Sequence, residues 1–115
     1  MESTLIHLDN NWRNTLKETL PNSKVCNKLA LFYSMFSDTT RLKIIITLLI
    51  KEMCVSDLSQ ILGINQTTIS HQLKLLKSNG AVVSTRRNKY IFYKVSDSLI
   101  NDIMINGVDY ILNNS

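Results

Sequence analysis

The run from Gly63 to Gly80 constrains the fold of this chain more than any other segment. It reads GINQTTISHQLKLLKSNG, which is a glycine turn, a helix with a polar N-terminal end, and a terminating glycine. Asn65 is a favourable N-cap for that helix, and Gly80 is expected to end it after about Asn79. Four apolar side chains are expected to face the protein interior: Ile69, Leu73, Leu75 and Leu76.

Helices are also predicted on the N-terminal side of this run. A short helix over 57–62, with Ser56 as its N-cap and Gly63 as its left-handed end, would pair with the helix after Asn65. Such a pair is a helix-turn-helix. Earlier in the chain, apolar spacing predicts a helix over 8–20 that ends at Pro21, and a second over 25–36. Asp38 is expected to cap a third helix, with four residues inward and three outward: Leu42, Ile45, Ile46 and Leu49, then Arg41, Lys43 and Lys51.

After Gly80 the apolar period changes from helical to alternating. The runs 81–86 and 90–95 are rich in β-branched and aromatic residues, and Arg87-Asn88-Lys89 joins them, so they predict a hairpin with a basic tip. Asp97 is then expected to cap a last helix. The fold class is therefore mainly α with a β-hairpin, a winged helix-turn-helix, in one domain over 1–115 with the helix-turn-helix at 55–80 and the wing at 81–96.

Charge is distributed unevenly along the chain. Residues 58–96 contain six Lys/Arg and no acidic residue, whereas the rest holds seven Lys/Arg against nine Asp/Glu. A surface that faces phosphates is expected to have this bias. We therefore expect a double-stranded DNA operator as partner, with ten candidate contacts: Gln66, Thr67, Thr68, Ser70 and His71 toward bases, and Lys74, Lys77, Arg86, Arg87 and Lys89 toward phosphates. For a single residue, a solvated helix end explains the polarity about as well.

Four motifs between Phe36 and Val95 are similar to those of the ArsR/SmtB family of winged-helix repressors. Asp38–Leu42 (DTTRL) matches the family's DPTRL, and Glu52–Leu58 (EMCVSDL) matches ELCVCDL. Ser70–Leu76 is the family's SHQLKLL recognition helix unchanged, and Tyr93–Asp97 follows its Tyr-x-Val/Leu-x-Asp wing ending.

The resemblance implies a homodimer that represses an operator and is released by an effector. It implies that 1–24 and 97–115 form the dimer interface, through Trp12, Leu16, Ile100, Ile103, Met104, Gly107, Val108 and Ile111. This agrees with an apolar content that so short a chain does not easily bury. Gly107 within a helix would be explained by close approach of another helix backbone, or by an irregular helix end.

The family's sensor residues are only partly present. Where the resemblance implies a thiolate pair, the chain has Cys54 and then Ser56, so a thiophilic metal ion would need Cys26 or His7 as a further ligand. The family's site on the last helix retains Asp97 but has Leu99, Tyr110 and Asn113 at the other positions, so zinc, nickel or cobalt is not expected there. A redox pair of Cys26 and Cys54, an unidentified small molecule or protein effector, and constitutive repression stay open.

Several classes of protein are not expected. No apolar run is long enough for a membrane span, the N-terminus does not resemble a secretory signal, and two cysteines make no disulfide framework, so the cytoplasm is expected. A phosphate loop, a Ser/His/Asp set and a carboxylate pair are all missing, so no enzyme is expected. The alternative is a winged-helix module that binds proteins instead of DNA, although its contact surface would usually be apolar at the centre.

Overall fold

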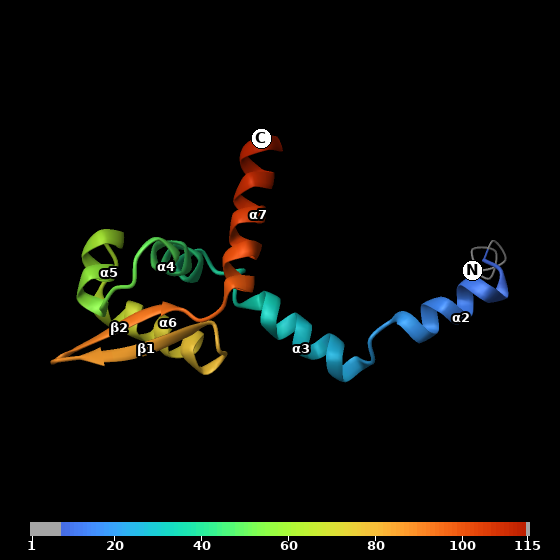
Figure 1. The fold of residues 1–115 in the computed structure, drawn as a ribbon, viewed down its shortest axis with the longest axis horizontal. Coiled ribbons are helices and arrows are strands. Elements are labelled where there is room, and N and C mark those ends of the chain that lie inside the picture. Colours follow the sequence, from blue (N-terminus) through green and yellow to red (C-terminus); the bar gives the residue numbers. More distant parts are fainter. Residues whose placement is uncertain (1–7, 115) are drawn as a thin grey trace. The chain divides into compact units, whose positions relative to one another are not determined.

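The computed structural model describes residues 8–114, and the chain divides between Tyr33 and Ser34 into two compact units. Helix α2 (Asn10–Thr19) lies in the first unit, together with nearly all of α3 (Ser23–Ser34). The second unit contains α4 (Thr39–Ile50), α5 (Val55–Leu62), α6 (Gln66–Ser78), β1 (Val82–Arg87), β2 (Tyr90–Val95) and α7 (Ser98–Asn114) (Figure 1). This order confirms a mainly α fold with a β-hairpin. The prediction of one domain over 1–115 stays a prediction.

Local capping defines the two helices of the first unit. The Asp9 carboxylate accepts a hydrogen bond from the Trp12 N–H at 2.9 Å and starts α2. Pro21 follows the end of that helix, as predicted, and Asn22 Oδ1 accepts from the Val25 N–H at 2.9 Å to start α3. Neither helix contains a residue that is buried by the described part of the chain, residues 8–114.

Helix α4 provides one wall of the core of the second unit. Its predicted cap is confirmed, because Asp38 Oδ2 accepts from the Arg41 N–H at 2.9 Å. The predicted inward face is only partly right. Ile45 is fully buried, but Ile44 and Leu48 accompany it, whereas Ile46 remains 39% exposed. The core stripe therefore lies at Ile44, Ile45 and Leu48, and Ile46 lies on a second apolar face of the same helix.

Arg41, predicted to point outward, instead joins three parts of the second unit. Its Nε donates to the Met35 carbonyl at 3.0 Å and its Nη2 to the Ser34 carbonyl at 3.1 Å. Its Nη1 donates to Gln72 Oε1 on α6 at 3.3 Å. Since a guanidinium has five donors in a rigid fork, Arg41 fastens the segment before α4 to the flank of α6.

The helix-turn-helix is formed by α5 and α6. The prediction that Ser56 caps α5 is wrong: the N-cap is Cys54, without a side-chain capping bond, and the helix begins at Val55. Gly63 ends α5 in the left-handed conformation at φ +67°, as predicted. On α6, Ile69, Leu73 and Leu76 are fully buried, but Leu75 is 42% exposed and was wrongly expected inside. Gly80, at φ +78°, follows the C-cap Asn79.

Strands β1 and β2 form the antiparallel wing. They pair from Val82 opposite Val95 to Arg87 opposite Tyr90, so Arg87 belongs to β1 and not to the turn as predicted. The turn is Asn88-Lys89, with Asn88 at φ +58°, a left-handed conformation that asparagine tolerates. The main chain of Met53 also pairs with β2: its N–H donates to the Tyr93 carbonyl at 3.2 Å, and its carbonyl accepts from the Tyr93 N–H at 2.8 Å.

Helix α7 starts directly after Asp97, as predicted. Ile100 and Met104 are buried against the rest of the second unit, whereas the residues from Ile105 to Asn114 are exposed. Because α7 continues to Asn114, Gly107 lies inside a regular helix, and an irregular helix end does not explain this glycine. None of the helices within residues 8–114 is both long enough and apolar enough to cross a membrane.

Candidate nucleic-acid interface

The exposed N-terminal end of α6 gathers the predicted base-contacting residues. The Asn65 side chain caps the helix by accepting from the Thr68 N–H at 2.8 Å. Burial of the stripe from Ile69 to Leu76 leaves the opposite side of the helix in solvent. Gln66, Thr67, Ser70 and His71 are exposed there, and Thr68 is half-buried. Four of the five candidates thus present polar groups outward from one rigid helix end.

Two lysines extend this surface along α6. Lys74 and Lys77 are both exposed. The Lys77 ammonium donates a hydrogen bond to Ser84 Oγ on β1 at 2.7 Å. This contact ties the second half of α6 to the face of β1 that also carries Arg86, two residues further along the strand.

The wing carries its cations on two faces. Arg86 lies opposite Ile91, and Arg87 lies opposite Tyr90, so these neighbours on one strand point to opposite faces of the hairpin. At the turn, the Lys89 ammonium lies 5.6 Å from the centre of the Tyr90 ring. All three cations are exposed, as a phosphate-facing role requires.

Of the wing residues Arg86, Arg87 and Lys89, Arg87 has an acidic partner among residues 8–114. Its guanidinium forms an ion pair with the Glu52 carboxylate from the segment between α4 and α5, and lies 5.0 Å from the centre of the Phe92 ring. The hydrogen bond from Arg87 holds the pKa of Glu52 below its usual value, helped by the charges of Arg87, Lys94 and Lys51. Sequence patterns do not predict this contact, since its partners lie 35 residues apart.

A cleft of about 430 Å³ separates the end of α6 from the wing. Gln66 and Ser70 line one side, and the residues from Lys89 to Ile91 line the other, with Tyr93. Cys54, Val55 and Ser56 complete the lining. The structure therefore brings three predicted DNA contacts together with the candidate sensor cysteine.

The surroundings of that cysteine do not form a metal site by themselves. Cys54 is 8% exposed, its Sγ lies 3.2 Å from Ser56 Oγ, and its thiol donates to Asp57 Oδ2 at 3.4 Å. Cys26 is exposed in the first unit, where its thiol donates to the Pro21 carbonyl at 3.5 Å. His7 lies outside the described residues, and among residues 8–114 no three His, Cys, Asp or Glu side chains gather around one point.

The residues expected at a dimer interface fall into three groups. Ile100 and Met104 are only 4% and 9% exposed and already belong to the core of their own chain. Trp12 and Leu16 are exposed on α2. The remaining four, Ile103, Gly107, Val108 and Ile111, line an apolar groove of about 340 Å³ between α4 and α7.

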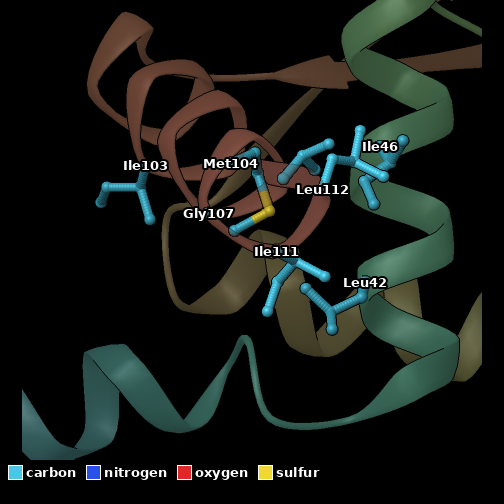
Figure 2. Close-up of a pocket in the computed structure, with 8 residues that line it drawn as sticks. Leu42, Ile46, Ile103, Met104, Gly107, Ile111 and Leu112 are labelled. Carbon is cyan, nitrogen blue, oxygen red and sulfur yellow. The ribbon is translucent and has the colours of Figure 1, made fainter. Parts of the chain in front are cut away.

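Figure 2 shows Ile111 and Leu112 of α7 facing Leu42 and Ile46 of α4 across this groove. A Cβ added at Gly107 would meet no described atom within 4 Å. The close approach that would explain this glycine is therefore not made by any described part of the same chain.

Comparisons with known proteins converge on one family. Residues 38–84 match the model described as "Bacterial regulatory protein, arsR family". The cadmium resistance transcriptional regulatory protein CadC of Listeria innocua is 34% identical over 114 residues, covering 95% of this chain and 90% of that protein. A transcriptional repressor SmtB homologue of Synechocystis sp. is 27% identical, and the match spans 73% of this chain and 64% of the relative. The crystal structure of the transcriptional repressor BigR from Xylella fastidiosa superposes with a TM-score of 0.68 at 33% identity, covering 76% of this chain and 89% of that one.

Proposed function

The chain belongs to the arsR family of bacterial regulatory proteins, and from this premise we propose that it is a homodimeric repressor that binds a double-stranded DNA operator. One observation carries the proposal: the exposed polar end of α6 stands beside a basic wing, and Lys77 joins the two elements through Ser84. Relatives named as transcriptional repressors support it.

In the proposed complex, the N-terminal end of α6 enters the major groove. Gln66 has the donor and acceptor to pair with adenine, and the hydroxyls of Thr67 and Ser70 suit either partner at a base edge. Lys74, Lys77 and the wing cations would contact phosphates, which position the protein without reading sequence. This division predicts that Gln66→Ala and His71→Ala relax sequence preference, whereas Arg86→Gln weakens binding to all DNA alike.

We propose that the dimer forms through α2 and the exposed half of α7. A second copy would cover Trp12, which is 59% exposed, and Ile111, which is 62% exposed, and would fill the groove between α4 and α7. The open space in front of Gly107 suits a helix backbone from that copy. Two recognition helices related by a two-fold axis would then read two half-sites about one helical turn apart.

The test of DNA binding uses the DNA upstream of the chain's own reading frame, since repressors of this kind commonly control their own operon. Gel shift from about 50 to about 200 mM salt should show a loss of affinity of about 10³-fold or more, if six or more phosphates are contacted per dimer. A scrambled duplex of equal length measures sequence preference. Binding that is flat with salt, or no binding, would contradict the proposal and favour a module that binds proteins.

Release by an effector is the second part of the proposal. Cys54 is the candidate sensor, because its thiol lines the cleft between the recognition helix and the wing. A thiophilic ion or a persulfide at this thiol would disturb both elements, and a relative named for cadmium resistance makes cadmium a suitable first probe. The protein–DNA complex is titrated with cadmium, zinc, arsenite and a persulfide donor. A response that Cys54→Ser abolishes and Cys26→Ser preserves would assign the sensor to Cys54 alone, and no response would favour an unidentified effector.

A further inference from the structure

In the folded protein, one carboxylate from outside residues 58–96 contacts a cation within that acid-free stretch. Glu52 lies outside residues 58–96, in the segment between α4 and α5, yet its carboxylate forms an ion pair with Arg87 of the wing. An acid at this place opposes the positive charge that binds phosphates. Its ion pair with a cation of the wing therefore calls for a functional explanation.

The main chain holds this acid in place. Met53, the next residue, pairs with Tyr93 of β2 through hydrogen bonds of 3.2 and 2.8 Å. The Arg87 guanidinium also lies over the Phe92 ring, 5.0 Å from its centre, which is a cation–π contact on the wing. The Glu52 side chain is 27% exposed and that of Arg87 is 51% exposed, so the pair is accessible to a DNA backbone without being fully in solvent.

The neighbouring arginine has no such partner. Arg86 projects to the other face of the hairpin, and it forms no ion pair with any residue from 8 to 114. The two adjacent arginines, which the sequence makes equivalent, therefore differ in how readily they are available to a phosphate.

We propose that Glu52 is an attenuator of DNA affinity, which holds the Arg87 guanidinium and places a carboxylate where the wing meets DNA. The inference rests on the proposed function. An Arg87–phosphate contact requires that the Glu52 contact be broken or shared, and it leaves the carboxylate facing a polyanion. Because phosphates carry no sequence information, Glu52 lowers the affinity for every duplex by about the same factor.

The experiment compares the full chain with Glu52→Gln, Arg87→Gln and the double variant, on the upstream duplex and on its scrambled counterpart. Glu52→Gln should bind both duplexes more tightly than the wild-type chain. The ratio of its affinity to that of the wild-type chain should be about threefold larger per subunit at about 50 mM than at about 200 mM salt. This is the salt dependence that one added phosphate contact gives. This gain in affinity should be smaller in the Arg87→Gln background, where Glu52→Gln relieves only the repulsion between the carboxylate and the phosphates. Asp102→Asn, an exposed site on α7, is the control for the same change in net charge.

Three results would overturn the attenuator while the proposed function stands. The first is salt-dependent binding by the wild-type chain without any gain in Glu52→Gln. The second is an equal gain in the Arg87→Gln background or in Asp102→Asn, which would assign the effect to net charge. The third is a loss of affinity in Glu52→Gln with an unchanged circular dichroism spectrum, which would make Glu52 an anchor of the wing. A wild-type chain that binds neither duplex at low salt would overturn both proposals.

Discussion

Two leucines on α6 provide a matched test of how this fold is stabilised. Leu73 is fully buried in the core, whereas Leu75, two residues later on the same helix, is 42% exposed. Leu73→Ala removes buried methyl groups and leaves a cavity, which should lower the free energy of unfolding by about 3 kcal/mol. Leu75→Ala removes a side chain that is only about half covered, so the loss should be about 1 kcal/mol or less.

The assay is urea unfolding followed by far-ultraviolet circular dichroism. Both variants and the wild-type chain are measured at the same two protein concentrations, because a dimer adds a concentration-dependent share to the apparent stability. The difference of about 2 kcal/mol corresponds to a gap in Tm of roughly 10 °C for a unit of this size. Leu73→Met, which conserves volume, should cost less than about 1.5 kcal/mol. Equal losses in the two alanine variants would refute the assignment of Leu73 to the core and Leu75 to the surface.

Three further outcomes are expected from the contacts described. Asn65→Ala removes the cap on the Thr68 N–H and should lower the free energy of unfolding, measured in urea, by about 1 kcal/mol. Asn65→Asp keeps an oxygen that can accept this hydrogen bond, so it should lower the free energy of unfolding much less; equal losses would argue against the cap. Ile111→Asp should shift sedimentation from dimer to monomer and leave the helix content unchanged, and a persistent dimer would exclude α7 from the interface. Since the hydrogen bond from Arg87 lowers the pKa of Glu52, its stabilising effect is present above the ordinary carboxyl pKa of about 4.3 and is lost as the pH falls through the lowered pKa. The urea midpoints of wild type and Glu52→Gln should therefore converge on acidification, and a widening gap would contradict this sign.

Local chemistry allowed much of the fold to be predicted. The caps at Asp38 and Asn65, and the left-handed Gly63, depend on residues within one turn of the helix end. Such features can be predicted because every group that takes part is close by in the sequence. The motif at Ser70–Leu76 lies within helix α6, as predicted, and the resemblance to the ArsR/SmtB family is confirmed.

Packing between elements could not be predicted in the same way. Helix α4 is apolar around most of its circumference, so its period did not reveal that one face meets the core and another, with Leu42 and Ile46, meets the groove beside α7. On α6, Leu75 is as hydrophobic as its buried neighbours Leu73 and Leu76, and it was wrongly expected inside for that reason. Its angular position on the helix, two residues after Leu73, directs it to solvent. The ion pair of Glu52 was not predicted because its partner, Arg87, comes from another element. The order of charges along the chain does not show which charges become neighbours on the folded surface.

The bridge between Met53 and Tyr93 has a consequence for the protein in the absence of DNA. It covers part of the outer edge of β2, whereas the outer edge of β1 has no strand beside it among residues 8–114. An open strand edge is a template for pairing with another molecule, and positive side chains on such a strand oppose that association. Arg86 and Arg87 lie on β1 itself. Neutral substitutions there would therefore lower the threshold for aggregation at high protein concentration, because the charges proposed to contact phosphate also keep free wings apart.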